Sequence, residues 1–358
     1  MTGAIGMMFG NQTPTVVSGG GGGGGGGNVG YLAFTGETSP YQQFYKVNSG
    51  NANSYDLIAS QPDTTVTMGV HQGAGCWHPS GTHFFECAGN VKEIWSKSGD
   101  SFTKLSTPSI TLPGGATGGA VWSPDGAWIA IPATNGTVYI LAWDGTALTL
   151  SQSLSGLGPS PMWSCAFNPN SDRLIVCGDN QMRLASLSAG TWGGIGSAIS
   201  SGSGENNRHF DVDWSRDNNY VASVDLQGSA RIFSVSGDTL TLANTMSGGG
   251  SGRTVGFSPD SKLLILNASM KAFGFNGVVW TTITAPTDGS GSDRRTISFN
   301  GAGTYFALKP DSGQPKLWSI SGSGHNSTFT FLGNPWSTNV TVAGSGTVQF
   351  IDSPQNTA

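Results

Sequence analysis

Short runs of alternating apolar and polar residues fill the chain, and turn-forming residues separate them every few positions. Such runs predict β-strands that are covered on one or both faces. Six times, a run ends in a large aromatic residue followed by a small polar residue and a turn, as in Trp122-Ser123-Pro124-Asp125-Gly126. The intervals between successive copies are 45, 45, 47, 43 and 42 residues. These anchor aromatics are Trp77, Trp122, Phe167, Trp214, Phe257 and Phe299.

Each repeat divides into four expected strands. In the repeat of Trp122 they are residues 118–122, 128–132, 137–143 and 147–151, separated by turn residues such as Asn-Gly and Asp-Gly. A four-stranded unit with this period is typical of a propeller blade. The anchor aromatics are then expected to be blade-core residues that pack sheet against sheet.

The number of third-strand patterns predicts the number of blades. Seven segments end an apolar or aromatic run in small polar residues and glycine, so we expect an all-β, seven-bladed propeller of four-stranded antiparallel blades over residues 29–358. Residues 31–34, 42–48 and 55–59 supply three strands of the opening blade, and 336–342 and 347–351 supply two strands near the C-terminus. We expect the C-terminal segment to complete the opening blade and close the ring. An eight-bladed ring with an incomplete last blade is the alternative.

The repeats resemble those of the WD-repeat family, and more closely the repeats of bacteriophage virion proteins. The resemblance covers about residues 29–352 and includes the aromatic-Ser-Pro-Asp-Gly turn, Tyr31-Leu32-Ala33-Phe34, Ser39-Pro40-Tyr41 and the segment 98–105. The Trp-Asp pair that names the WD family occurs at Trp143-Asp144 alone. The resemblance implies a structural propeller of the virion, associated with the tail or capsid, although propellers host many unrelated functions.

Residues 1–28 have a different composition and form a predicted glycine-rich N-terminal arm. Nine consecutive glycines at 19–27 make a flexible tether, and a compact apolar cluster precedes them. A disordered tail is one interpretation, and an arm that inserts into a neighbouring subunit is the one we favour. The expected anchoring residues are Met7, Met8, Phe9, Val16 and Val17.

Composition excludes several classes of partner. The net charge is -5 and no basic block occurs, so nucleic-acid binding is not expected. No run of 18 apolar residues exists, so we expect no membrane insertion. No Lys or Arg precedes Lys46, and no long apolar run begins the chain, so no secretory signal is expected. The four cysteines are expected to be free, buried thiols, as in a protein assembled in a reducing cytoplasm.

Candidate catalytic chemistry is sparse. The five histidines lack a zinc-site spacing with cysteine or with each other, and the oligoglycine is not followed by the Lys-Ser/Thr pair of a phosphate loop. We therefore predict no metal, no cofactor and no catalytic residue. Asp211 and Asp213 project to one face of a strand, and we interpret them as a solvated or channel-lining pair.

One cluster of cationic positions stands out. Counted back from the anchor aromatics, arginines and a histidine stand four to six residues before the anchors of three consecutive repeats. They would begin the innermost strands on one face, where they could bind carboxylates or an acidic sugar, or simply be solvated or paired with aspartates. The candidate binding face comprises Arg208, His209, Arg253, Arg294 and Arg295.

Three functional hypotheses follow. The first is a non-enzymatic virion protein whose arm binds other virion proteins, namely capsid, portal or tail subunits. It would be located in the virion after assembly in the host cytoplasm. The second is a carbohydrate-binding module that recognises a host-surface glycan through rim tryptophans. The third is an enzyme, such as a polysaccharide lyase or hydrolase, with its chemistry in the channel. The tryptophans of the second hypothesis are Trp77, Trp163, Trp192 and Trp280.

Overall fold

We describe a computed structural model of the chain. It describes residues 30–35, 42–48, 51–59, 61, 74–88, 91–105, 110–112, 119–158, 160–200, 208–226, 228–246, 254–266, 270–287, 294–310, 314–333 and 348–350. The predicted N-terminal arm, with Met7, Met8, Phe9, Val16 and Val17, lies outside these residues. No helix among the described residues is long and apolar enough to cross a membrane.

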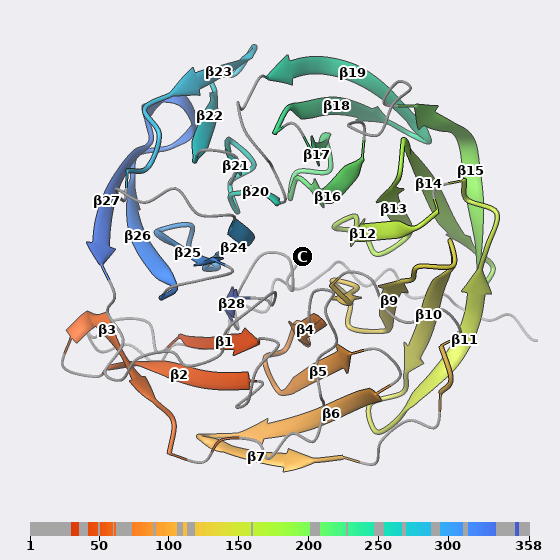
Figure 1. The fold of residues 1–358 in the computed structure, drawn as a ribbon, viewed down its shortest axis with the longest axis horizontal. Helices are drawn as coiled ribbons and strands as arrows, with labels where there is room; N and C mark the ends of the chain where they lie inside the picture. The colour runs from red at the N-terminus through yellow and green to blue at the C-terminus, as the bar shows by residue number, and fades with distance from the viewer. Residues whose placement is uncertain are drawn as a thin grey trace, which may run out of the picture.

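The described strands form seven four-stranded antiparallel sheets arranged as the blades of a ring (Figure 1). Blade 1 contains β28 (Val348–Phe350), β1 (Tyr31–Thr35), β2 (Gln42–Asn48) and β3 (Asn51–Leu57). The short C-terminal strand β28 is the innermost strand and pairs with β1, so the end of the chain completes the first blade. The seven-bladed prediction and its closure are confirmed, and the eight-bladed alternative is wrong.

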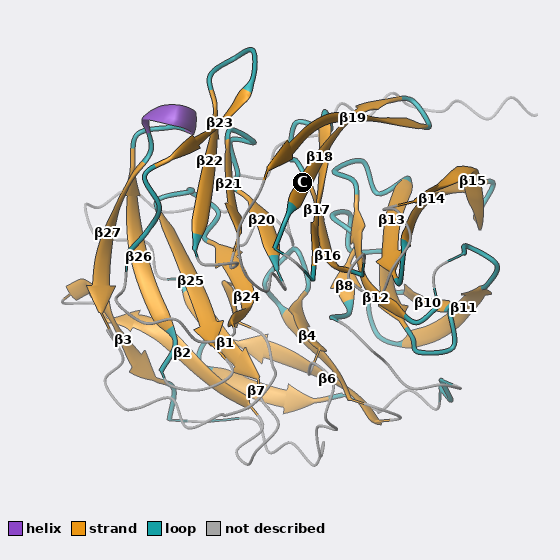
Figure 2. Ribbon diagram, turned by 45° about the horizontal axis from the view of Figure 1, so that its top comes forward, coloured by secondary structure: helices purple, strands orange, loops and turns teal. Residues whose placement is uncertain are grey.

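The other six blades each run from the innermost to the outermost strand in chain order. A 3₁₀ helix, η1 (Gly324–Asn326), lies at the rim beside β22 and β23 (Figure 2). The strands are, in blade 2, β4 (Ala74–Trp77), β5 (His83–Ala88), β6 (Val91–Ser98) and β7 (Ser101–Lys104); in blade 3, β8 (Val121–Trp122), β9 (Trp128–Pro132), β10 (Val138–Trp143) and β11 (Leu148–Leu154); in blade 4, β12 (Met162–Phe167), β13 (Arg173–Gly178), β14 (Gln181–Ser188) and β15 (Thr191–Ser200); in blade 5, β16 (His209–Trp214), β17 (Tyr220–Asp225), β18 (Ala230–Ser236) and β19 (Thr239–Met246); in blade 6, β20 (Val255–Phe257), β21 (Leu263–Leu266), β22 (Lys271–Phe275) and β23 (Trp280–Ile283); and in blade 7, β24 (Arg294–Phe299), β25 (Tyr305–Pro310), β26 (Lys316–Ser321) and β27 (Thr328–Gly333).

The hydrophobic core is divided among the blade interfaces. The described buried residues form seven apolar clusters, and each cluster draws on two neighbouring blades. All six anchor aromatics are at most 4% exposed, which confirms their core role. The cluster between blades 7 and 1 includes Phe350 of β28 together with Phe34 and Leu317, so closure of the ring has its own apolar core.

The turn after each anchor aromatic explains the repeated sequence. Its fourth residue has a positive φ in all six copies, which glycine adopts without strain and serine or asparagine adopts at a cost. Ser171 and Ser261 take this conformation, and their hydroxyls accept hydrogen bonds of 2.9 Å from the backbone N–H groups of Asp125 and Asp217 in the preceding blades. These serines therefore link neighbouring blades at the face of the ring where the innermost strands end.

Ring closure by Phe350 gives a first prediction. Phe350→Ala should lower the free energy of unfolding by about 3 kcal/mol, because the side chain is 2% exposed in the closure core. Phe331 is 40% exposed, so Phe331→Ala is the matched control and should cost less than about 1 kcal/mol. Denaturant unfolding of both variants measures the difference. Equal losses would show that β28 does not close the ring.

Candidate functional site

Three of the seven innermost strands share an irregularity where they begin, at the face of the ring that we call the channel mouth. Ladder registers shift between Met162 and Ser164 in β12, between His209 and Asp211 in β16, and between Arg294 and Thr296 in β24. The residues at these bulges, Trp163, Phe210 and Arg295, all stand four positions before their anchor aromatics. A bulge leaves one residue out of the ladder and redirects its side chain. The channel mouth therefore carries a set of equivalent, unladdered positions.

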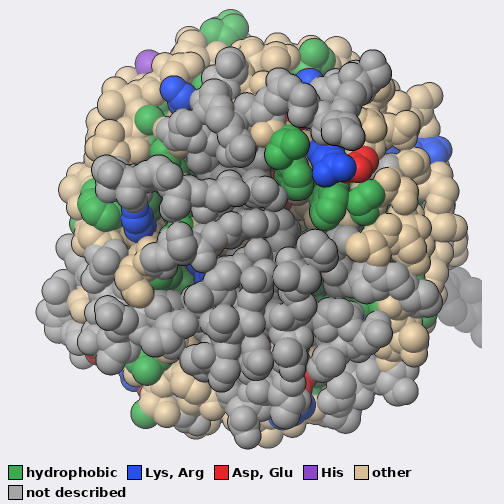
Figure 3. Space-filling view, viewed as in Figure 1, with side chains coloured by type: hydrophobic (Ala, Val, Ile, Leu, Met, Phe, Trp, Pro, Cys, Tyr) green, Lys and Arg blue, Asp and Glu red, His purple; other side chains and the backbone are tan. Residues whose placement is uncertain are grey.

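Two of these positions meet between blades 4 and 5. The rings of Trp163 and Phe210 lie 5.6 Å apart and are tilted by 38°. The indole N–H of Trp163 donates a 2.7 Å hydrogen bond to Oδ1 of Asp179, and Nε of Arg208 lies 3.2 Å from the same oxygen. Trp163 is partly exposed, and the Arg208 side chain is 41% exposed. In Figure 3 a basic side chain lies beside an acidic one, with hydrophobic side chains around them, over the inner strands of these two blades.

We call Trp163, Asp179, Arg208 and Phe210 the mouth cluster. It is built from two strand starts and from the β13–β14 turn, and the backbones of Asp179 and Arg208 also form an isolated antiparallel bridge. The carboxylate of Asp179, the indole of Trp163 and the guanidinium of Arg208 are thus held together by side-chain contacts and by the backbone bridge between Asp179 and Arg208. The cluster combines a partly exposed aromatic surface with a partly exposed cation, which suits binding of a polar ligand.

Asp211 holds three blades together. Its carboxylate accepts hydrogen bonds of 2.7 Å from the Ser164 hydroxyl in blade 4, 2.7 Å from the Thr254 hydroxyl and 3.1 Å from the Val255 N–H in blade 6. Burial raises the pKa of Asp211 to about 6, although these hydrogen bonds favour the ionised form and act in the opposite direction.

Asp213, two residues further along β16, has a similar role. It accepts a 2.8 Å hydrogen bond from the Phe257 N–H of blade 6 and forms a 2.7 Å ion pair with Arg216. Of the predicted solvated or channel-lining pair, Asp213 is not solvated, because it is 3% exposed, whereas Asp211 is partly exposed and bound to both neighbouring blades. These carboxylates at the crowded inner edge accept hydrogen bonds from backbone N–H groups of the next blade, and those N–H groups would otherwise lack an acceptor.

His209 is a buried part of the same region. It is 1% exposed, and neither ring nitrogen has a hydrogen-bond partner among the described residues. Burial lowers its pKa to about 4, and the nearby Arg231 guanidinium contributes to this effect. Arg231 in turn lies 3.7 Å from Asp225. His209 is therefore a neutral, enclosed side chain and not an exposed ligand-binding cation as predicted.

The predicted binding face is placed only in part. Arg208 and His209 lie together at the start of β16, and Arg208 pairs with Asp179 rather than with Asp213. Arg294 and Arg295 begin β24, which is the expected position, and the structure describes their backbone alone. Arg253 lies outside the described residues.

Three of the four predicted rim tryptophans are core residues. Trp77 is 0% exposed, Trp192 is 1% exposed and Trp280 is 5% exposed. Trp192 packs edge-on against Trp128 of blade 3, and Trp280 does so against Tyr220 of blade 5, so both close the outer end of a blade interface. Only Trp163 of the four is partly exposed.

Sequence reasoning missed Phe210, Asp179 and the position of Trp163 at the mouth. A signal for two of them was available, because Trp163 and Phe210 occupy the repeat position that singled out Arg253 and Arg295. Asp179 belongs to a turn in another strand pair, and only the fold brings it beside Arg208.

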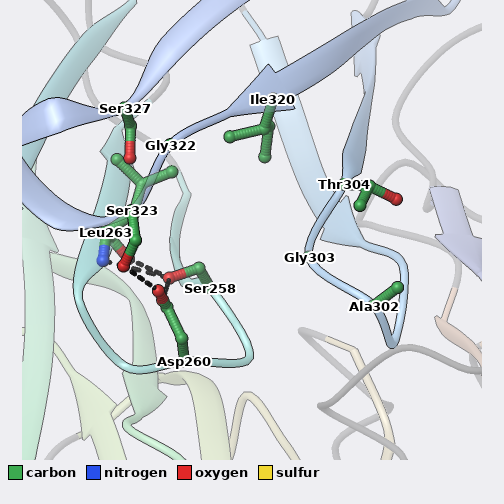
Figure 4. A pocket seen from close by; sticks show the side chains of 10 residues that line it. All are labelled: Ser258, Asp260, Leu263, Ala302, Gly303, Thr304, Ile320, Gly322, Ser323 and Ser327. Atoms are coloured by element: carbon green, nitrogen blue, oxygen red, sulfur yellow. Dashed lines mark hydrogen bonds between the residues drawn. The ribbon is translucent and has the colours of Figure 1, made fainter.

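Two further hollows lie away from the mouth. One, of about 250 Å³, lies between blades 6 and 7, where the Ser258 and Ser323 hydroxyls both donate to Asp260 (Figure 4). The other, of about 740 Å³, is an open groove at the rim, lined by residues of β23, η1 and β27. In the first hollow, Ser258 and Asp260 belong to the turn that follows the anchor Phe257, and their hydrogen bond stabilises that turn. Neither matches the mouth cluster in combining a fixed cation with an aromatic surface.

Other reactive groups are enclosed or structural. All four cysteines are free and buried, as predicted, and Cys165 lies opposite Val176 in the ladder. Burial raises the pKa of every one of these thiols. No group of three or more His, Cys, Asp or Glu side chains within the described part of the chain could hold a metal ion.

Comparisons with known proteins support the fold. A family model for the WD domain, G-beta repeat, matches residues 149–185, which run from β11 into β14. No curated protein matches the sequence. A protein from Lactobacillus plantarum has a similar structure, with a TM-score of 0.72, 14% identity, and coverage of 90% of this chain and 99% of that chain.

Two further similar structures are described as lactonases. One is a provisionally assigned 6-phosphogluconolactonase from Bacteroides uniformis, with a TM-score of 0.71, 11% identity, and coverage of 90% of this chain and 99% of that chain. The other is a periplasmic gluconolactonase from Pseudomonas aeruginosa, with a TM-score of 0.67, 12% identity and the same coverage. None of these three is described as a phage protein, and at such identities the likeness shows the propeller fold alone.

Asp211 and His209 give opposite pH dependences of stability. Asp211 has a raised pKa in the folded state, so its contribution is complete below about pH 4 and is lost as the pH rises through about 6. His209 has a lowered pKa, so its contribution is complete above about pH 6.5 and is lost as the pH falls through about 4. In the wild type the two slopes oppose each other over the same range.

Single substitutions should separate the two slopes. Between pH 4 and pH 7 the stability of Asp211→Asn relative to wild type should rise, and that of His209→Gln should fall, each by about 3 kcal/mol at ~1.4 kcal/mol for each unit of pKa shift. Denaturant unfolding at a series of pH values measures these differences. Curves parallel to that of the wild type would contradict the assigned pKa directions.

Proposed function

We propose that this protein is a non-enzymatic structural component of a bacteriophage virion. Its propeller is displayed on the particle, and residues 1–28 anchor it to capsid, portal or tail subunits. The observation that carries the non-enzymatic part is the role of the inner carboxylates. Asp211 and Asp213 serve as hydrogen-bond acceptors for the next blade, so they are engaged in holding the ring together.

The virion assignment is supported by the repeat resemblance and by the composition of the arm. An oligoglycine tether behind an apolar cluster suits a segment that reaches a neighbouring subunit and inserts there. The ring itself suits display, because seven inter-blade cores and the serine links at the opposite face favour a rigid platform.

The location we propose is the virion, after assembly in the host cytoplasm. Four free, buried thiols are typical of a protein that folds in a reducing compartment. Burial of every thiol also suppresses the thiolate, so the protein would tolerate later exposure to oxidising conditions outside the cell.

A carbohydrate-binding module is the second candidate, and the mouth cluster favours it. Trp163 offers a partly exposed indole beside the Arg208 guanidinium, which is the pairing that a polar sugar ring can use. The two candidates are compatible, since a displayed propeller could also recognise a host-surface glycan.

Deletion of the arm tests the anchoring. A variant lacking residues 1–28 should lose association with purified particles by about tenfold or more while its unfolding midpoint stays within about 2 °C of wild type, since the arm precedes the ring. Co-sedimentation measures association. Replacing Met7, Met8 and Phe9 by serine, with the glycines retained, should reproduce the loss, and replacing Thr13 and Thr15 by serine is the control. Undiminished retention of the deletion variant would contradict the proposal.

The lactonase neighbours supply a test of the non-enzymatic part. With 6-phosphogluconolactone as substrate, hydrolysis should proceed at the rate in buffer alone, because the inner carboxylates are engaged in inter-blade hydrogen bonds. Proton release followed at constant pH measures this rate, with an active lactonase as positive control. A catalysed rate that Asp211→Asn abolishes would identify an enzyme instead.

A further inference from the structure

We propose that the mouth cluster between blades 4 and 5 binds a carboxylated saccharide, with a sugar ring stacked on Trp163 and its carboxylate on the Arg208 guanidinium. This inference deepens the proposed function, because it names the class of molecule that the displayed ring would recognise. It does not depend on where the arm docks.

The environment of Trp163 points to a stacking surface. Five tryptophans, Trp77, Trp122, Trp192, Trp214 and Trp318, are almost fully buried, whereas the bulge in β12 places Trp163 at the mouth, where it is partly exposed. Its N–H is satisfied by Asp179, and Phe210 supports one side of the ring. What remains for a ligand is the exposed aromatic surface, which favours the apolar C–H face of a sugar ring.

Arg208 offers a partly exposed cation beside Trp163. Asp179 contacts the guanidinium through Nε, and the described residues provide no hydrogen-bond partner for its two terminal amino groups. These groups are the pair that binds a carboxylate in bidentate fashion. Because the same Asp179 oxygen also accepts from Trp163, the stacking surface and the cation keep a fixed relation to each other.

The charge around the mouth decides between a neutral and an anionic saccharide. Asp179 offsets the charge of Arg208, and Asp225 offsets that of Arg231. The backbone of Arg294 and Arg295 begins β24 at the repeat positions equivalent to His209 and Phe210. The Arg208 side chain is 41% exposed and that of Asp179 is 20% exposed, so the guanidinium is the more accessible charge beside Trp163, which favours an acidic saccharide over a neutral one.

Two matched ligands and matched variants test the site on the full-length protein. The probes are trigalacturonic acid and its methyl ester, which share the sugar rings and differ in charge. Isothermal titration calorimetry should show binding of the acid and at least about tenfold weaker binding of the ester.

Substitutions assign the two parts of the site. Arg208→Gln should weaken binding of the acid by about tenfold or more and leave the weak binding of the ester unchanged, since the carboxylate contact is lost. Trp163→Leu should weaken both ligands. Arg173→Gln is the arginine control, because Arg173 is also partly exposed and held by aspartates, at the opposite face. Trp128→Leu is the tryptophan control, because Trp128 is also partly exposed, and each variant is first shown to be folded at the titration temperature.

Several results would overturn the inference. They are equal binding of acid and ester, acid binding that Arg208→Gln leaves unchanged, or no binding of trigalacturonic, glucuronic or sialic acid up to about 10 mM. Binding of glucose 6-phosphate in place of every carboxylated sugar would assign the site to phosphate instead. If no saccharide binds but particle association depends on the arm, the display function stands without the saccharide site. If the acid binds as expected but particle association does not depend on the arm, only the saccharide site stands.

Discussion

Each blade is a sheet whose two faces are both apolar, and it can bury them only against the blades on either side. The buried residues accordingly form one cluster at each of the seven interfaces. Every cluster needs both of its blades, so a missing interface would expose two apolar faces at once. The C-terminal strand β28 supplies Phe350 to the last interface, which makes closure a matter of packing as well as of strand pairing.

Closure of the ring brings the innermost strands together around the axis, and this crowding accounts for the polar groups found there. Backbone N–H groups at the inner edge need acceptors, and Asp211 and Asp213 supply them from the preceding blade. The bulged positions are different, because they are released from the ladder. The ring therefore uses one set of inner residues for cohesion, while the bulge in β12 leaves Trp163 partly exposed at the mouth.

Much of the fold could be predicted from the sequence because local patterns carry it. Strands β2 and β9 coincide with their predicted ranges, and β11 extends beyond its own. The innermost strand β8 is shorter than predicted, and the outer strand β3 begins earlier, because its polar edge residues give no apolar alternation.

The site could be predicted less well, since its contacts join segments distant in the sequence. Trp77 is both an anchor aromatic and one of the predicted rim residues, and only burial decides between these roles. The pairing of Arg208 with Asp179 depends on how blade 5 is placed beside blade 4. The repeat register could have identified Trp163 and Phe210, because they share the position of Arg253 and Arg295.

The central proposal is that the mouth cluster binds a ligand through Trp163 and Arg208 without transforming it. A crystal structure of the full chain with an oligogalacturonate tests this most directly. The account predicts an intact saccharide with one ring over Trp163 and a carboxylate on Arg208, while Asp211 keeps its hydrogen bonds to Thr254 and Val255. A saccharide in the rim groove instead, or a cleaved product beside Asp211, would contradict it.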